Sequence, residues 1–307
     1  MKHRVWLSIA ALAVLAGCGR STSSLQANPN PGAPVGSDQA QVSGVLQNNP
    51  EYVDEDVWQS SQAQAYDNPG GFAAIRPLRF WREIASVDRT VDTQFGAPDS
   101  SGRPTMALVT IHRHVLGTFN VVAGAIDPTD TSRSLIRKRL DDDWTRKLVL
   151  MRMPAPRVTA GDTSRPRWRV VGTSGVNVQT RGGSTHIVSL RIQSGTLDTT
   201  ITDPLALHRL RSVVLVQPGE PVTLTATTGD SSDVVLFYGH DMRRRFANAG
   251  HGTFQFEFPA GSFPGLRHFG VDALSNGTLF DDQAPYDSNA WVFAYTVDPR
   301  REPVEGN

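Results

Sequence analysis

The sequence predicts an α+β domain, in which helices precede a curved antiparallel sheet, followed by a second, all-β sandwich domain. Three observations lead to this fold class. Apolar residues recur every three or four positions between residues 78 and 95, as on one face of a helix. After residue 106 they alternate with polar residues, as in half-buried strands. From residue 207 onward, short alternating segments are separated by turn residues, as in a sandwich.

The first residues have the organisation of a bacterial export signal. Residues 2–4 are Lys, His and Arg, and residues 5–15 are apolar except for one serine. This run is too short to span a bilayer, which needs ~20 apolar residues. A basic start, a short apolar run and small residues after it are typical of a secretory signal peptide, here residues 1–17.

The order Leu15-Ala16-Gly17-Cys18 resembles the lipobox of bacterial lipoproteins. The resemblance implies cleavage between Gly17 and Cys18 and acylation of Cys18, which would anchor the chain to a membrane. An ordinary secretory signal with an incidental cysteine is the alternative. Gly19 follows the cysteine instead of the aspartate typical of inner-membrane lipoproteins, which implies the outer membrane in a Gram-negative source. Cys18 is the only cysteine, so no intrachain disulfide can form.

The composition excludes some partners. The formal net charge is zero and the pI is about 7.1, which gives no sign of nucleic-acid binding. No phosphate loop, dinucleotide fingerprint or paired-histidine zinc helix is present, so no cofactor is expected. We expect the membrane, through the N-terminal lipid, and another envelope protein as partners.

Residues 18–48 are expected to be a lipidated cysteine and a flexible linker, because Ser, Asn, Pro, Gly and Gln dominate them. The α+β domain is expected over residues 49–205. Asn49 and Pro50 suit the N-cap and first position of a helix. Residues 78–95 predict a second helix, which Gly96 and Pro98 would end.

The sheet of this domain is expected to begin at residue 106. A hairpin is predicted from 134–140 and 144–153, with its tip at Asp141-Asp142-Asp143, and further strands at 167–179 and 186–193. The stretch RWRVVGTSGVNV (167–178), after a helix and a hairpin, resembles late strands of cystatin-like, nuclear-transport-factor-like domains. The resemblance implies a sheet and helices around a cone-shaped cavity.

Residues 206–298 predict the sandwich, and residues 299–307 a polar tail. The segments PGEPVTLTATT, GLRHFGVDALSNG and AWVFAYTV resemble strands of bacterial immunoglobulin-like modules. That resemblance implies a fold and little about function. Phe254, Phe256 and Phe258 are expected on one face of a strand, and Asn276-Gly277 in a hairpin turn.

Several polar residues are candidates for a site. The interior of the expected cone would be formed by Trp81, Asp88, His112, Trp144 and Trp168. His112 and His114 share one side of a strand and could share a metal, although an ordinary polar face is the simpler interpretation. Asp141-Asp142-Asp143 offers oxygen ligands for calcium, but a solvated hairpin tip explains it better. The loop residues Asp281, Asp282 and Asp287 are a second candidate for a metal. No catalytic residue is expected.

Two functions from different classes remain open. The first is a lipid-anchored envelope protein with a binding or structural role. The alternative is a small-molecule-binding or catalytic pocket in the α+β domain. Convergent polar groups in an open cavity would favour the pocket, and a filled interior would favour the first function.

Overall fold

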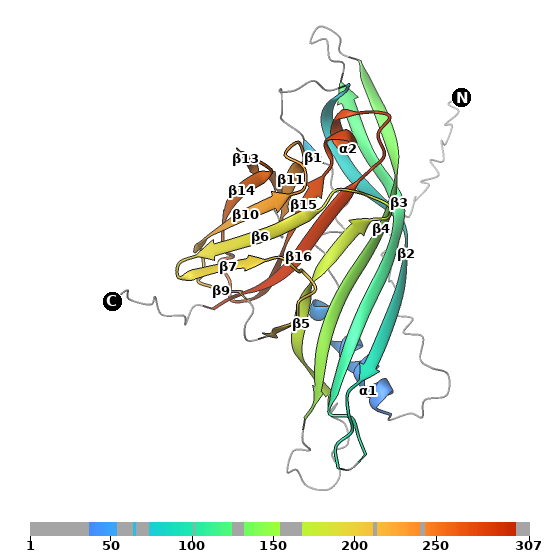
Figure 1. The fold of residues 1–307 in the computed structure, drawn as a ribbon, viewed down its shortest axis with the longest axis vertical. Helices are drawn as coiled ribbons and strands as arrows, with labels where there is room; N and C mark the ends of the chain where they lie inside the picture. Colours follow the sequence, from blue (N-terminus) through green and yellow to red (C-terminus); the bar gives the residue numbers. More distant parts are fainter. Residues whose placement is uncertain are drawn as a thin grey trace, which may run out of the picture.

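The protein is built almost entirely from antiparallel strands (Figure 1). A computed structural model describes residues 37–53, 64–65, 74–100, 102–124, 132–153, 168–210, 214–239 and 243–298. The predicted signal peptide, Cys18 and the expected polar tail lie outside these residues. Among the described residues there are two α-helices, α1 (Asp38–Asn48) and α2 (Asn276–Phe280), and one 3-10 turn, η1 (Pro50–Tyr52).

The larger of two sheets follows the order β1-β2-β3-β4-β5-β16-β15-β11-β12. Two short strands, β8 (His208–Arg209) and β9 (Val214–Val216), pair with β5 and β16. The nine strands of the main path, in sheet order, are Gln64–Ala65, Arg76–Phe95, Met106–Gly124, Arg133–Arg152, Trp168–Thr180, Ser288–Val297, Gly265–Leu274, Val234–Tyr238 and Arg243–Arg245.

The smaller sheet follows the order β13-β14-β10-β6-β7. Its strands are Ala247–Gly250, Thr253–Pro259, Pro221–Thr228, Ile187–Ser194 and Leu197–Ile201. It packs on one face of β16, β15 and β11, with Phe254, Phe269 and Trp291 in the core between the two sheets. Phe256 is half-buried beside Phe254 and Phe258, so the expected shared face of these three phenylalanines is confirmed.

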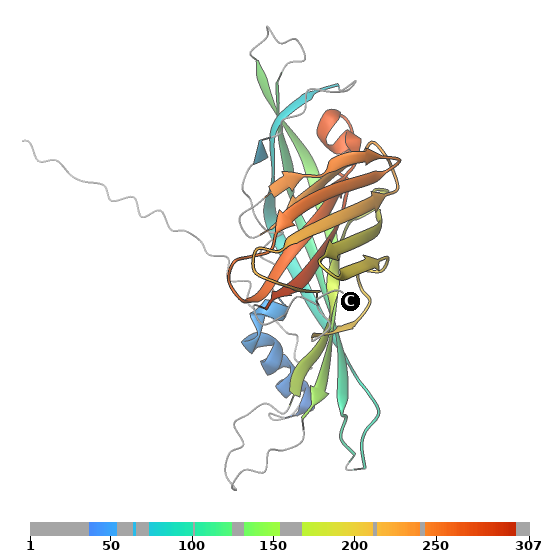
Figure 2. The same ribbon diagram turned by 90° about the vertical axis from the view of Figure 1, so that its left-hand side faces the viewer.

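The large sheet curls back on itself, so that β16, β15 and β11 also face β2, β3 and β4 (Figures 1 and 2). A second core, which contains Phe80, Phe119, Leu236 and Val292, fills this interior. These three strands are therefore covered on both faces. The sequences of β11 and β16 are nearly continuous apolar runs for that reason, as expected for strands buried on both sides.

Helix α1 covers the concave face at the other end of the long strands. Ser37 caps it through a hydrogen bond from the Ala40 amide, and Val42, Val45 and Leu46 are buried against β3, β4 and β5. The indole of Trp168 donates to Asp38. Residues 38–48 are thus not part of a flexible linker, which is a correction to the expected boundary at residue 48.

The expected helix at 78–95 is also wrong, because these residues form strand β2. Two β-bulges explain the misleading pattern: the register with β3 shifts between Pro77 and Arg79 and again between Ile84 and Ser86. Each bulge inserts a residue and reverses which positions face the core. Apolar residues that alternate with polar ones and are shifted by one position at each bulge can resemble the three- and four-residue spacing of a helix.

The fold class predicted from the sequence is therefore wrong: there is no α+β domain with helices first. Nor do residues 206–298 make a sandwich by themselves, since β15 and β16 extend the sheet of β2–β5. The second sheet is completed by β6 and β7, which come before residue 206: β6 pairs with β10, and β7 pairs with β6. The strands expected after residue 207 are present, but they are shared between two cores.

Two further local predictions are corrected. Residues 133–152 form one continuous strand, β4, so Asp141-Asp142-Asp143 is no hairpin tip. Asn276-Gly277 begins helix α2, and Ser275 caps that helix by accepting a hydrogen bond from Thr278. At Asn49, the expected helix is only the short turn η1 in the described part of the chain, which resumes after residue 53 at Gln64.

Candidate functional site

A buried polar network joins the two layers of the curled sheet. Nη2 of Arg82, on β2, donates to the carboxylate of Asp272, on β15, over 2.8 Å. Nε of Arg82 donates to the hydroxyl of Tyr286 and Nη1 to that of Tyr238. Ser288 and Tyr238 donate in turn to Asp272. The guanidinium is therefore held by several partners in a buried interior.

Asp142, on β4, is the second carboxylate of this network. It accepts hydrogen bonds from Thr180 at 2.8 Å and from Tyr286 at 3.1 Å. Tyr286 therefore connects the two halves, because its hydroxyl accepts from Arg82 and donates to Asp142. Two carboxylates share one buried cation, which leaves the network short of positive charge.

Burial determines the pKa values in this network. It raises the pKa of Asp142 to about 6, against the opposing effects of Arg82 and of the hydrogen bonds from Thr180 and Tyr286. Burial also raises the pKa of Tyr238 to about 12. For Arg82, burial acts to lower the pKa, but the nearby Asp272 leads a set of opposing charges that raise it well above its ordinary value.

The network is arranged to hold the layers together. Arg82 also lies over the rings of Phe119 and Tyr286, so its flat faces are covered as well as its edges. Lys138 makes a similar connection, because its ammonium donates to the carbonyls of Gly277 and Asp281 around helix α2. Groups whose donors are already used within the protein are poorly placed to bind a substrate.

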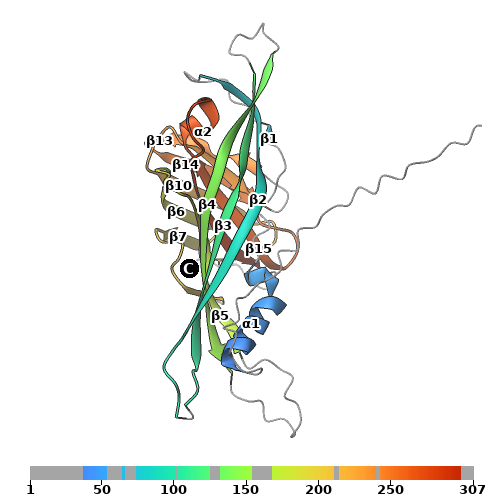
Figure 3. The same ribbon diagram turned by 90° about the vertical axis from the view of Figure 1, so that its right-hand side faces the viewer.

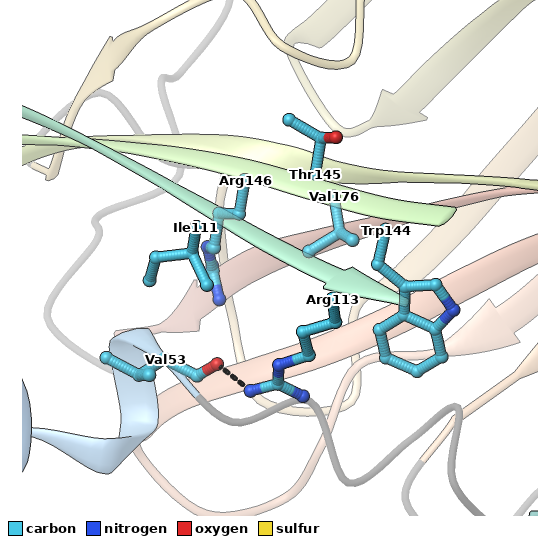
Figure 4. A pocket seen from close by; sticks show the side chains of 7 residues that line it. All are labelled: Val53, Ile111, Arg113, Trp144, Thr145, Arg146 and Val176. Atoms are coloured by element: carbon cyan, nitrogen blue, oxygen red, sulfur yellow. Dashed lines mark hydrogen bonds between the residues drawn. The ribbon is translucent and has the colours of Figure 1, made fainter. Parts of the chain in front are cut away.

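A small cavity lies below the network, between η1 and the strands β3, β4 and β5 (Figure 4). It is lined by Val53, Ile111, Arg113, Trp144, Thr145, Arg146 and Val176. Figure 4 shows Arg113 reaching the carbonyl oxygen of Val53, to which it donates. Arg113 also lies over the ring of Trp144. The space that remains holds about one water molecule, so this cavity has no room for an organic ligand.

The five residues expected to line a cone do not meet. Trp81, Asp88 and His112 lie on the convex face of β2 and β3, where Asp88 and His112 are exposed. Trp144 and Trp168 are buried on the concave face, in two different cores. Only Trp144 contributes to the cavity. Alternation along each strand puts the first three residues and the two buried tryptophans on opposite sides of one sheet.

The candidate metal ligands are also separated. His114 donates to Asp141 over 2.8 Å and His112 contacts Thr145, so the two imidazoles have different partners. The carboxylate of Asp287 accepts from the amides of Ser184 and Thr185.

The other aspartates of this loop point elsewhere. Asp281 accepts from the amides of Gln283 and Ala284, and Asp282 is exposed. Within the described ranges, no group of three His, Cys, Asp or Glu residues could hold a metal ion.

Asp141, Asp142 and Asp143 alternate across β4. Asp142 points into the buried network, while Asp141 and Asp143 lie on the convex face and form ion pairs with Arg139 and Arg181 respectively. The three carboxylates therefore cannot act together on one ion. Gly17 and Cys18 lie outside the described residues.

The sequence analysis did not identify Arg82, Asp272 or Tyr286. One signal was present: Asp272 interrupts the apolar run FGVDAL, and a charge within a doubly buried strand needs an internal partner. The sequence does not identify Arg82 as this partner. The residues around Arg82 have the spacing of a helix, whereas its inward position follows from strand β2.

Comparison with protein families, curated proteins and solved structures gave no match for this chain. The two described α-helices have neither the length nor the apolar run that a membrane crossing requires.

Proposed function

We propose that this chain is a lipid-anchored cell-envelope protein with a binding or structural role. The lipobox-like order Leu15-Ala16-Gly17-Cys18 behind an apolar run supports the anchor, and Gly19 supports the outer membrane. A lipid on Cys18 would fix one end of the chain at a bilayer and leave the β-structure in the aqueous compartment beside it.

One observation carries the choice of a non-catalytic role: side chains of the described residues occupy the concave side of the curled sheet. The Arg82–Asp272 network occupies one end, the small cavity lies in the middle, and helix α1 covers the other end. The curled sheet is the part of the fold where a ligand pocket would be expected, and its interior is occupied by the protein's own side chains. No described feature favours the alternative, a small-molecule or catalytic pocket.

The anchor is tested by the variant Cys18→Ala. Wild-type protein produced in bacteria should incorporate labelled palmitate and partition into the detergent phase, and the variant should do neither. Ser21→Ala is the matched control and should behave like the wild type. Detergent partitioning of Cys18→Ala equal to that of the wild type, without label, would rule out the lipid anchor.

Sorting and role are tested separately. Gly19→Asp should move the protein to the inner-membrane fraction if the lipoprotein sorting rule applies. Cross-linking in intact cells should then give a defined adduct with an envelope component for the wild type, which is lost when Cys18→Ala releases the chain. Turnover of a small molecule by the purified chain, abolished by a substitution at Arg113, would contradict the non-catalytic role.

A further inference from the structure

The convex face of β2, β3 and β4 is covered by no described element. Figure 3 shows these three long strands in front of the rest of the molecule, with both helices and the second sheet behind or beside them. The concave face of the same strands is closed by two cores. The convex face is therefore a regular surface of three long strands that the described fold leaves open.

Arginines gather at one end of this face, where β2 begins, β3 ends and β4 begins. The strand register forms four rows across the three strands, which are Arg76-Gly124-Arg133, Arg79-Val122-Leu135, Trp81-Asn120-Arg137 and Glu83-Thr118-Arg139. Residues paired across neighbouring strands point to the same side of the sheet. The rows cover about 20 Å along the strands and about 10 Å across them. We call these four rows the arginine face.

The arginine face carries an excess of positive charge. Arg76, Arg79, Arg133 and Arg137 are exposed, and none of them forms an ion pair within the described chain. Arg139 is bound by Asp141, just beyond the last row. The one carboxylate of the rows, Glu83, accepts from Asn120 instead of from an arginine. Because the whole chain has a formal net charge of zero, this excess is a local asymmetry.

Apolar side chains lie between the arginines. Leu135 is 45% exposed, although it lies between Arg133 and Arg137 on the same face of β4. Val122 and Trp81 are half-buried beside it. Leu78, the extra residue of the first bulge, contacts the position of Gly124 and so lies on this side as well. Arginine with interspersed tryptophan and leucine is the composition of surfaces that sit at a lipid interface.

We propose that the arginine face binds the phosphate headgroups of an anionic phospholipid surface. The guanidinium group is a planar fork that matches phosphate oxygens in pairs. The neighbouring guanidinium groups are spaced within about one Debye length, so they attract a charged surface together. A convex face suits a broad surface against which it can lie, and the apolar side chains can enter the headgroup region.

The proposal goes beyond the lipid anchor, and its test is made without one. The chain beginning at Gly19 lacks Cys18 and retains every residue that the structure describes. It is sedimented with vesicles of phosphatidylcholine alone and of phosphatidylcholine mixed with phosphatidylglycerol. We expect binding to the mixed vesicles, release at high salt, and no binding to phosphatidylcholine alone.

Two matched triple variants locate the binding surface. Arg79→Gln/Arg133→Gln/Arg137→Gln should weaken binding to the mixed vesicles about 100-fold, from three lost headgroup contacts. Arg103→Gln/Arg209→Gln/Arg244→Gln removes the same charge from exposed arginines elsewhere and should bind like the wild type. Leu135→Ser should weaken binding without altering its salt dependence. Equal thermal melting of all variants shows that each is folded.

Three results would overturn the proposal. The first is a failure of the wild-type chain to bind the mixed vesicles. The second is an equal loss of binding in the two triple variants, which would indicate a general charge effect. The third is tight binding to soluble polyphosphate without binding to vesicles, which would assign the arginine face to a polyanionic polymer instead of a membrane surface.

Discussion

The guanidinium of Arg82 lies 2.8 Å from the carboxylate of Asp272, which is 190 residues further along the chain, and both side chains are buried. This contact ties β2 to β15 across the interior of the curled sheet. It joins the layer of long strands β2, β3 and β4 directly to the strands β16, β15 and β11 that face it. The energetic cost of burying these two charges is offset only while both are present.

Removing one partner of this pair should destabilise the protein strongly. Arg82→Met leaves Asp272 as a buried carboxylate without its cation, so we expect a loss of about 3–5 kcal/mol in the free energy of unfolding. The double variant Arg82→Met/Asp272→Leu should lose less free energy of unfolding than the two single variants lose in total. Urea unfolding of the full chain measures all three. Arg191→Gln, which breaks an exposed pair with Asp198, is the control and should have little effect.

Stability should depend on the protonation of Asp142. The pKa of this carboxyl is about 6 in the folded protein, mainly because of burial, and 3.8 in an unperturbed chain. A raised pKa means that the folded state binds the proton more tightly. Asp142 therefore contributes on the order of 3 kcal/mol to the free energy of unfolding below about pH 4, and this contribution is lost as the pH rises through 6.

The variant Asp142→Asn isolates this effect. Its free energy of unfolding minus that of the wild type should increase between pH 4 and pH 6 and then stay level. Asp143→Asn, on the convex side of the same strand, should show no such trend. A constant difference for Asp142→Asn across this range would show that Asp142 titrates normally in the folded protein.

The opposite pH dependence is expected from His268 on β15. Burial, helped by the charge of Arg146, lowers the pKa of this imidazole to about 4, and its Nε2 has no hydrogen-bond partner among the described residues. Neutral His268 therefore contributes on the order of 3 kcal/mol to the free energy of unfolding above pH 6.5, and this contribution is lost as the pH falls through 4. His268→Gln should therefore resist acid better than the wild type in thermal melts, while His112→Gln, at an exposed site, should match the wild type.

Two glycines test elements that the sequence analysis predicted wrongly or missed. A methyl group at Gly117 would lie 2.2 Å from the carbonyl oxygen of Glu83 beside the second bulge, so Gly117→Ala should lower stability by about 1–3 kcal/mol. Gly44 lies within α1 with open space around it, so Gly44→Ala should raise stability by up to about 1 kcal/mol. Destabilisation by Gly44→Ala would argue against the helix.

Local alternation predicted the strands well wherever it ran without interruption. Residues 107–115 alternate as expected, with Ala107, Val109, Ile111 and Val115 buried, and the strands after residue 214 lie close to their expected positions. Alternation failed in β2, because a bulge is a property of pairing with β3 and leaves no separate mark in the sequence. It failed at Asp141-Asp142-Asp143, because three acids indicate a turn unless an interior partner is known.

The arrangement of the strands was not available from local patterns. Ser37 followed by Val42, Val45 and Leu46 is a capped helical spacing, and this signal for α1 was outweighed by the polar composition around it. The Arg82–Asp272 network depends on the curl of the sheet, which brings strands from the two ends of the chain together. The pairing of β5 with β16 joins the two halves of this sheet, and it links residues more than 100 positions apart in the sequence.

The position of β16 has a consequence for the order in which the chain can fold. The last described strand lies in the centre of the large sheet, between β5 and β15, and its residues belong to both adjoining cores. Asn289 on this strand bonds Asn177 on β5, 112 residues earlier. Neither core can close until residues 288–297 have been synthesised. Folding must therefore follow the synthesis of β16 and, with such long-range contacts, should be slow. A truncation before residue 288 should abolish the whole structure.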